Sequence, residues 1–138
     1  MNRLVVDASV AIKWYLPEVH SEDALRLLDD ERELLVPDLV WSEVGNILWK
    51  KWQKDQLTAE QPPAILQDFG QLGLVIHSSQ KLAPTAWSLA ARLKRSFYDS
   101  MYLALAETQA CPLVTADRRL FNAVSPSGFN LVWIEDIV

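Results

Sequence analysis

The order of apolar and polar segments predicts an α/β protein, a three-layer α/β/α sandwich around a mostly parallel sheet. Short apolar runs alternate with longer segments of helical periodicity, which is typical of parallel strands joined by helices. Half of the 138 residues are hydrophobic, enough for a substantial core. No repeat, low-complexity tract or linker divides the chain. We therefore expect one domain over residues 1–138.

Five short runs are predicted as strands because they are rich in Val, Leu and Ile and are bounded by Pro, Gly or polar residues. They lie at residues 4–6, 34–36, 74–76, 112–115 and 130–134. The order of strand, helices, strand and helices then repeats along the chain.

Two helices are predicted between the first two strands. Ser9 is a suitable cap for a short helix over residues 11–16, which Pro17 ends. Ser21 is expected to cap the second helix, whose apolar side includes Ala24 and Leu27.

Two more helices are predicted before the third strand. Asp38 is expected to cap a long helix that runs to about Gln53. Thr58 is expected to start the next helix, although the pair Pro62-Pro63 blurs its beginning.

The last three helices are predicted from residue 84 onward. Pro84 suits the first turn of a helix. Ser96 begins a further helix that ends near Ala110, and a short helix follows Asp117.

Four acidic residues stand at the edges of predicted core elements: Asp7, Glu43, Asp99 and Asp117. Asp7 and Asp117 directly follow strands, and ligands of open parallel sheets bind beyond the carboxyl ends of strands. Asp99 heads a helix and Glu43 lies one turn into another, so both can reach the same edge. A buried carboxylate is costly unless it is neutralised, paired or bound to a cation. The four acids together therefore indicate one shared cation.

Each acid taken alone also has an ordinary structural interpretation. Asp7 suits a turn residue that accepts backbone hydrogen bonds. Asp99 occupies the N3 position of a capping box that begins at Ser96, and Asp117 is a potential N-cap. Glu43 shares a helix face with apolar residues, where it could pair with a buried Arg.

The donor set selects the kind of cation. Clustered carboxylates repel one another and would take up protons unless a cation neutralised them. A site of oxygen ligands without His or Cys favours a hard ion, Mg²⁺ or Mn²⁺. Such an ion keeps waters and open positions for phosphate oxygens, which suits phosphodiester hydrolysis.

Other classes of phosphate chemistry fit the sequence less well. An aspartyl-phosphate hydrolase would have a second acid two residues after the first, but position 9 is Ser. A receiver domain would need adjacent acids and a late Lys, and no Gly-rich phosphate loop is present. The non-enzymatic alternative is an interaction module whose acids are only caps and ion pairs.

Four segments of the chain resemble the motifs of PIN-domain ribonucleases. They are Val5-Val6-Asp7-Ala8-Ser9, Ser42-Glu43-Val44, Tyr98-Asp99-Ser100-Met101-Tyr102-Leu103-Ala104 and Val114-Thr115-Ala116-Asp117. The chain also resembles this family in length and motif order, and it is most similar to the VapC-type toxins of toxin–antitoxin pairs.

The resemblance implies a function and a set of site residues. It implies Mg²⁺- or Mn²⁺-dependent cleavage of RNA by a homodimer that a cognate antitoxin protein inhibits. Asp7, Glu43, Asp99 and Asp117 would be the catalytic and metal-binding acids. Thr115 would support the last acid, and Ser9 would be a polar residue near the site. A catalytically inactive PIN-like interaction module is the alternative.

Charge, targeting signals and aromatic residues complete the expectations. The net charge of −5 does not favour nucleic-acid binding as a whole, so basic residues near the acids would have to guide RNA. The candidates for this role are Lys13, Arg92, Arg95 and Arg118. The sequence shows no signal peptide or membrane span, and one Cys cannot form an internal disulfide, so we expect a cytoplasmic protein.

Among the six Trp residues, Trp41 and Trp87 are expected in the core. Trp49 and Trp52 are expected at the surface or in partner contacts.

Overall fold

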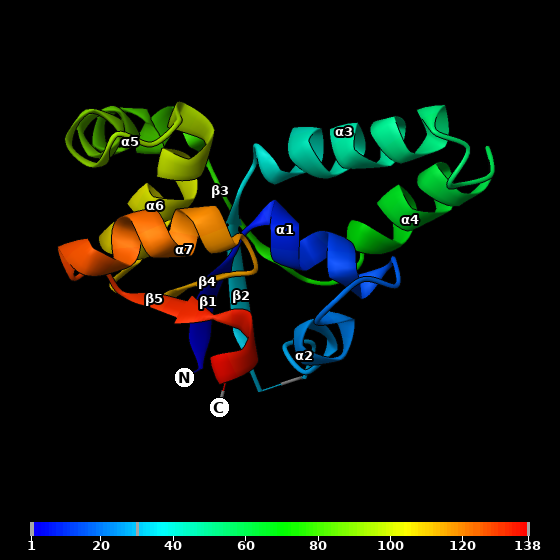
Figure 1. Ribbon diagram of the computed structural model, residues 1–138, viewed down its shortest axis with the longest axis horizontal. Coiled ribbons are helices and arrows are strands. Elements are labelled where there is room, and N and C mark those ends of the chain that lie inside the picture. Colours follow the sequence, from blue (N-terminus) through cyan, green and yellow to red (C-terminus); the bar gives the residue numbers. More distant parts are fainter. Residues whose placement is uncertain (1, 30, 138) are drawn as a thin grey trace.

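A sheet of five parallel strands forms the centre of the protein, seen here in a computed structural model that describes residues 2–29 and 31–137 (Figure 1). The strand order is β3-β2-β1-β4-β5. The strands are β1 (Arg3–Val6), β2 (Glu33–Pro37), β3 (Val75–His77), β4 (Leu113–Thr115) and β5 (Leu131–Trp133). The predicted α/β/α sandwich is confirmed, and every strand pair in the sheet is parallel.

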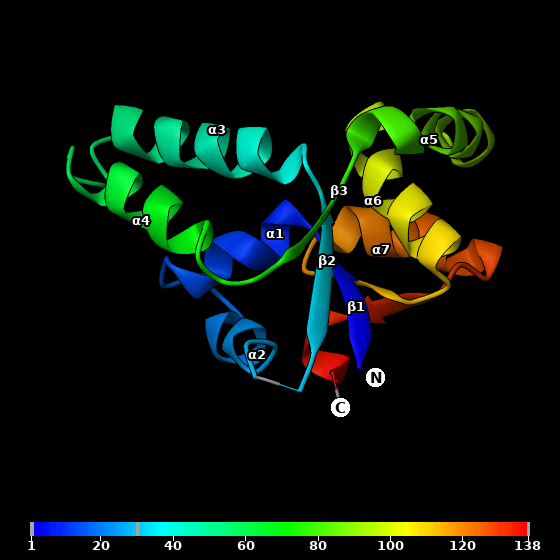
Figure 2. The same ribbon diagram turned by 180° about the vertical axis from the view of Figure 1, so that it is seen from behind.

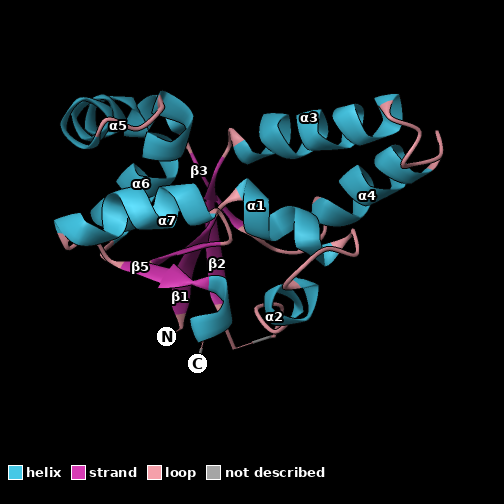
Figure 3. Cartoon of the chain, in the orientation of Figure 1, coloured by secondary structure: helices cyan, strands magenta, loops and turns pink. Residues whose placement is uncertain are grey.

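Helices connect the strands and cover both faces of the sheet (Figure 3). The α-helices are α1 (Ala8–Ala11), α2 (Ser21–Leu25), α3 (Val40–Gln53), α4 (Gln61–Phe69), α5 (Ser79–Leu93), α6 (Phe97–Gln109) and α7 (Arg118–Val124). Short 3-10 turns are η1 (Ile12–Trp14), η2 (Ser125–Ser127) and η3 (Ile134–Asp136). Within the described ranges, no helix combines the length and the apolar character that crossing a bilayer requires.

The middle strand β1 marks the point where the strand order changes direction. The chain proceeds outward from β1 through β2 to β3, and then returns to place β4 on the other side of β1. Val5 is accordingly in register with Leu35 of β2 and with Leu113 of β4. Ligands of open α/β sheets bind at the carboxyl ends of the strands beside such a switch point.

Alternating side chains of the central strands supply the two halves of the core. Leu4 and Val6 are fully buried on one face, against apolar residues of α1 to α4. Val5 is fully buried on the opposite face, against α5, α6 and α7. Successive strand side chains point to opposite faces, so a strand buried on both sides has no polar position. This explains the continuous apolar runs in the sequence.

The first two helices begin differently from the sequence prediction. Asp7, not Ser9, caps α1, because the Asp7 carboxylate accepts a hydrogen bond from the Val10 amide and the helix starts at Ala8. The residue at the N-cap of α2 is His20, with φ 68°. The Ser21 hydroxyl instead donates to the Leu16 carbonyl.

The beginnings of three later helices also differ. Asp38 does not cap α3; its carboxylate accepts hydrogen bonds from the backbone N–H and the hydroxyl of Ser79, and so joins the end of β2 to the start of α5. Helix α4 begins at Gln61 rather than at Thr58. Pro84 lies inside α5, because Ser78 caps that helix and starts it earlier. The predicted cap Ser96 and the predicted end of α3 at Gln53 are confirmed.

Helices α3 and α4 form an antiparallel arm that reaches away from the sheet (Figure 2). Trp49 and Trp52 are exposed on this arm, with their ring centroids 5.3 Å apart, as expected. Trp41 packs against the core. Trp87 was predicted in the core, but it is 69% exposed on α5, because the helix turns Ala86 and Leu89 inward instead.

Phe69 is the residue on which the packing of the arm depends. Its ring is 1% exposed and lies among the rings of Trp14, Tyr15 and Trp41, with centroid distances of 6.3, 6.3 and 4.9 Å. We expect Phe69→Ala to lower the free energy of unfolding by roughly 3–5 kcal/mol, because it leaves a cavity among these rings. Urea denaturation measures the change.

The control for this experiment is Trp87→Ala, which removes a larger but exposed ring and should change the free energy by no more than about 0.5 kcal/mol. Equal losses in the two variants would contradict the assignment of Phe69 to the core.

Candidate active site

An acidic hollow lies at the carboxyl ends of β1 and β4, beside the switch point of the sheet. Its cavity volume is about 200 Å³. It is lined by all four acids together with neighbouring residues of the helix starts: Asp7, Ala8, Ser9, Glu43, Ile47, Asp99, Tyr102 and Asp117. Four helices begin around it, since these residues belong to the first two turns of α1, α3 and α6 and to the cap of α7. The structure therefore brings together the four acids that the sequence singled out.

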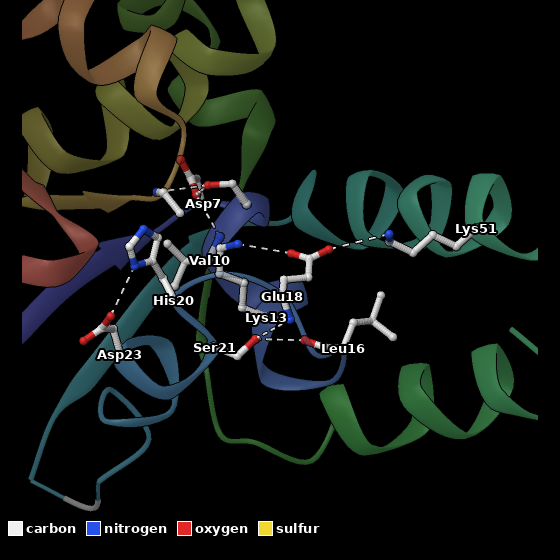
Figure 4. Close-up of polar contacts among 11 residues, drawn as sticks. Asp7, Val10, Lys13, Leu16, Glu18, His20, Ser21, Asp23 and Lys51 are labelled. Carbon is white, nitrogen blue, oxygen red and sulfur yellow. Dashed lines mark hydrogen bonds and ion pairs between the residues drawn. The ribbon is translucent and has the colours of Figure 1, made fainter. Parts of the chain in front are cut away.

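Asp7 is the most firmly held of the four acids. It is 6% exposed, and its Oδ1 accepts hydrogen bonds from the Ser9 hydroxyl at 2.5 Å and from the Val10 amide at 3.2 Å (Figure 4). Its Oδ2 accepts a 2.5 Å hydrogen bond from the hydroxyl of Thr115, which is fully buried in β4. Asp7 thus performs the turn function that we considered for it, and it also lines the hollow.

The two hydroxyls that hold Asp7 also hold the loop after β4. Ser9 Oγ accepts from the Ala116 amide at 3.2 Å, and Thr115 Oγ1 accepts from the Asp117 amide at 3.0 Å. Each hydroxyl therefore receives one hydrogen bond from the loop and donates its proton to Asp7. Thr115 thus contacts the backbone amide of Asp117, and its role in supporting that acid at a metal site stays a prediction.

Asp117 is both a helix cap and a site residue. Its Oδ1 accepts hydrogen bonds from the amides of Arg119 and Leu120, at 3.0 and 3.2 Å, at the start of α7. A carboxylate has two oxygens, so capping through Oδ1 leaves Oδ2 without a partner among the described residues. The two interpretations of Asp117 are compatible.

Glu43 carries an unsatisfied buried oxygen. Its Oε1 is buried and has no hydrogen-bond partner within the described chain, and no Arg pairs with it there. The buried hydroxyl of Tyr102 is close enough to affect the pKa of Glu43, yet that hydroxyl also lacks a partner with proper hydrogen-bond geometry. An unpaired buried oxygen is costly, which indicates a ligand or water in the hollow.

Asp99 is partly neutralised by a neighbouring cation. Arg95 precedes α6, four residues before Asp99, and its Nη2 lies 3.2 Å from Asp99 Oδ2. The Asp99 amide donates to the Ser96 hydroxyl at 3.0 Å, which is half of the expected capping box. The other half of the box is missing, because the Asp99 carboxylate accepts a hydrogen bond from Arg95 and not from the Ser96 backbone amide. Asp99 therefore does not act only as part of a helix cap.

Burial raises the pKa of three of the acids. It raises the pKa of Asp7 to about 6, although the hydrogen bonds from Ser9, Thr115 and Val10 oppose the change. Burial also raises the pKa of Glu43 and of Asp99, and in Asp99 the Arg95 guanidinium acts against it. Neighbouring carboxylates add to all three shifts. The hollow is therefore short of positive charge.

A hard divalent ion fits the donors of the hollow. Carboxylate and hydroxyl oxygens line it, Glu43 Oε1 is free, and the raised pKa values show that a cation would be favoured. Within residues 2–29 and 31–137, no group of three His, Cys or acidic side chains is arranged to hold an ion directly. An ion in the hollow would therefore have to be held partly through water, and Mg²⁺ is an ion that keeps several waters and is bound through few carboxylates.

The basic residues proposed to guide RNA contact other side chains of the protein. Lys13 Nζ lies 3.2 Å from Glu18, which also contacts Lys51 at 3.6 Å (Figure 4). Arg95 pairs with Asp99.

The remaining two candidates also have partners. Arg92 lies 3.9 Å from Glu107, and the Arg118 guanidinium lies 3.7 Å from the centre of the Trp133 ring. Neither residue lines the acidic hollow.

Tyr102 is the site residue to which the sequence assigned no role. It is 3% exposed and lines the hollow beside the acids, and burial with nearby Glu43 strongly raises its pKa, so the hydroxyl keeps its proton. The available signal was its spacing of three residues from Asp99 on α6, which puts both on one helix face. Because Tyr102 lies within the apolar run of residues 101–105, this spacing does not stand out in the sequence.

Comparison with known proteins was consistent with the geometry. The family model described as PIN domain matches residues 4–125. Ribonuclease VapC3 of Pyrobaculum aerophilum is 36% identical over 120 residues, covering 86% of this chain and 92% of that protein. Ribonuclease VapC9 of Mycobacterium tuberculosis is 39% identical over 117 residues, covering 85% of this chain and 87% of that protein.

Solved structures share the fold at lower sequence identity. VapC20 of Mycobacterium tuberculosis, described as a Sarcin-Ricin loop cleaving toxin, has a TM-score of 0.70 at 17% identity, with 91% of this chain and 95% of that chain covered. A toxin–antitoxin complex from Klebsiella pneumoniae has a TM-score of 0.70 at 18% identity, with 97% and 99% covered.

The raised pKa of Asp7 predicts a pH dependence of stability. The folded chain holds this proton more tightly than the unfolded chain, whose Asp7 has a pKa near 3.8, so the free energy of unfolding should fall as the pH rises from 3.8 to about 6. Asp7→Asn has no such proton. Without divalent ions, the free energy of unfolding of Asp7→Asn should therefore fall less between pH 3.8 and about 6 than that of the wild type, by up to about 3 kcal/mol.

Urea denaturation at several pH values measures both curves. Loss of the hydrogen bonds to Asp7 shifts the variant equally at every pH, so only the slopes are compared. Parallel curves would show that Asp7 does not titrate in this range.

Proposed function

The chain belongs to the PIN domain family, and from this premise we propose that it is a divalent-metal-dependent endoribonuclease, the toxin of a toxin–antitoxin module. The family model spans most of the chain, and relatives at 36–39% identity are named as VapC ribonucleases. The reaction is hydrolysis of an RNA phosphodiester bond with Mg²⁺, or Mn²⁺ in its place.

One observation carries this proposal. Four carboxylates from β1, α3, α6 and the β4–α7 loop converge on one hollow at the switch point of the sheet, and a buried oxygen of Glu43 is left without a partner. Glu43 caps no helix, so helix capping does not account for its place in this cavity. A hard cation would satisfy the free oxygen and offset the desolvation of its neighbours.

The residues of the hollow would share the catalytic work. Asp7, Asp99 and Asp117 would hold the ion, in part through water, and the hydroxyls of Ser9 and Thr115 fix the orientation of Asp7. When bound, Mg²⁺ stabilises the negative charge that builds on the phosphate and acidifies water.

Glu43 would be a further ligand of the ion or would orient the attacking water. Its raised pKa suits it to accept a proton from that water during in-line displacement. The protonated Tyr102 hydroxyl would donate a hydrogen bond to Glu43 or to the water, and so act as a positioning residue.

Partners are proposed on the same basis. A cognate antitoxin protein would bind and inhibit the enzyme in the cytoplasm; a solved structure with the same fold is described as a toxin–antitoxin complex. The exposed rings of Trp49 and Trp52 would suit contacts in a homodimer or with that protein.

Binding of a metal ion predicts a gain in stability. Titration with Mn²⁺ should raise the free energy of unfolding of the wild type, by about 2.7 kcal/mol at one hundred times the dissociation constant. Glu43→Gln and Asp7→Asn should show a much smaller gain, because each removes a charged ligand. Thermal denaturation with and without Mn²⁺ measures the effect.

The matched control is Asp55→Asn, which removes an exposed carboxylate at the α3–α4 turn and should respond to Mn²⁺ like the wild type. An inactive PIN-like module whose acids are only caps would show no gain in any variant.

Cleavage of RNA tests the proposed activity directly. Asp99→Asn should lower the rate of Mg²⁺-dependent cleavage at least about a hundredfold without unfolding the chain, because the carboxylate is exchanged for a neutral group of equal size. Expression of the wild type should arrest growth, and both Asp99→Asn and co-expression of the neighbouring gene should relieve the arrest. Sequencing of RNA ends maps the cuts.

Asp55→Asn again serves as the control and should cleave like the wild type. Normal cleavage by Asp99→Asn would show that the assigned site is wrong.

A further inference from the structure

A second hollow adjoins the acidic one along α3. Its cavity volume is about 620 Å³, in the range of small-molecule sites. Glu43 and Ile47 line both hollows, so the two are continuous. Ser42, Asn46, Lys50 and Tyr98 line only the second hollow. A substrate phosphate at the acids would therefore place the adjoining nucleotide over these four residues.

One row of polar side chains on α3 borders the second hollow. Ser42, Asn46 and Lys50 follow one another at intervals of four residues, which places them along one face of the helix. All three are exposed, and none makes a side-chain hydrogen bond or ion pair with another residue in the described chain. Lys50 differs in this from Lys13 and Lys51, whose charges are engaged by Glu18. The row offers an unused hydroxyl, amide and ammonium group.

Tyr98, from α6, supplies an aromatic surface that borders the same hollow. It directly precedes Asp99 in the first turn of α6, is 63% exposed and stacks on no other ring of the described residues. An exposed ring leaves its face in water, where a planar ligand can cover it. Proteins that bind single-stranded nucleic acids use such rings as stacking platforms.

From this juxtaposition we infer that the second hollow is a nucleobase subsite, which binds a base of single-stranded RNA next to the phosphate held at the acids. The inference rests on the proposed ribonuclease function and extends it to substrate recognition. Tyr98 stacks on the base. Asn46, with an amide NH₂ donor beside a carbonyl acceptor, reads the edge of the base, and Ser42 supplies a hydroxyl beside it. Lys50 contacts a neighbouring phosphate.

The two kinds of contact have different consequences for sequence preference. Every base has a π-face, so stacking on Tyr98 should strengthen the binding of all single strands alike. A paired donor and acceptor discriminates between bases, so Asn46 should determine which base is preferred. Substitutions at the two positions should therefore have separable effects.

Binding to an inactive chain tests the subsite. Asp117→Asn is the suitable background, because Asn also caps helices while one of the four carboxylates of the site is removed. Fluorescence anisotropy with short labelled oligo(A), oligo(U) and oligo(C) RNAs, and with an abasic RNA of equal length, gives the affinities in the presence of Mg²⁺.

In this background, Tyr98→Ala should weaken binding of each RNA that has bases about tenfold and leave binding of the abasic RNA unchanged. Tyr98→Phe should bind within about twofold of the parent, because it keeps the ring. Trp87→Ala, which removes an exposed ring outside the hollow, should have no effect. Asn46→Ala should change the ratio of affinities between the homopolymers by about fivefold or more.

Several results would overturn the inference. Equal affinities of Tyr98→Ala and Tyr98→Phe for RNA with bases would show that Tyr98 does not stack on a base. If Tyr98→Ala bound abasic RNA as much more weakly as it bound RNA with bases, Tyr98 would contact the backbone instead. An unchanged ratio between homopolymers in Asn46→Ala would remove the base-reading role.

Mg²⁺-dependent cleavage by the chain with Asp117 intact, measured in parallel, tests the proposed function separately. If the chain cleaves RNA and Tyr98→Ala changes neither binding nor cleavage, the subsite is contradicted while the proposed nuclease activity is supported. Base-dependent binding through Tyr98 without cleavage would support the subsite and contradict the nuclease.

Discussion

The hydrogen bonds that join Asp7 to Thr115 and Ser9 are the interaction on which the site depends. They link the ends of β1 and β4, which are 108 residues apart in sequence. The two hydroxyls also accept the amides of Ala116 and Asp117 and so fix the loop that carries the last acid. The first and the last acid are therefore oriented by one network. Changing either hydroxyl would disturb both.

The same network makes the hollow electrostatically expensive without a cation. Asp7 is desolvated between two strands, and the nearby carboxylates of Glu43 and Asp99 are partly buried as well. Hydrogen bonds lower the cost for Asp7, and Arg95 lowers it for Asp99. The Tyr102 hydroxyl lowers it for Glu43, but Glu43 Oε1 still has no hydrogen-bond partner among the described residues, as expected if a ligand binds in the hollow.

An acidic chain can bind a polyanion only where its charges are locally arranged to do so. Most of the basic residues near the acids have structural partners: Glu18 holds Lys13 and Lys51, and Trp133 lies under Arg118. Lys50, beside the acidic hollow, keeps its charge available. Recognition of RNA would then rely on the bound cation, on this Lys and on stacking, rather than on a broad basic surface.

The sequence by itself determined the alternation of strands and helices, because the burial of side chains follows the local periodicity of the chain. It also identified the four acids, since charged residues beside buried strands are conspicuous. The tertiary structure decided what local patterns do not contain. Strand order placed β4 beside β1 and so brought Thr115 to Asp7. Packing placed Trp87 at the surface and Pro84 inside α5 rather than in its first turn. Burial of Leu82, Ala86 and Leu89 outweighed the preference of Trp for the core and of Pro for the start of a helix. The role of Tyr102 became clear from the packing of α6 beside α3, which brings its hydroxyl to Glu43, although its spacing from Asp99 already put both residues on one helix face.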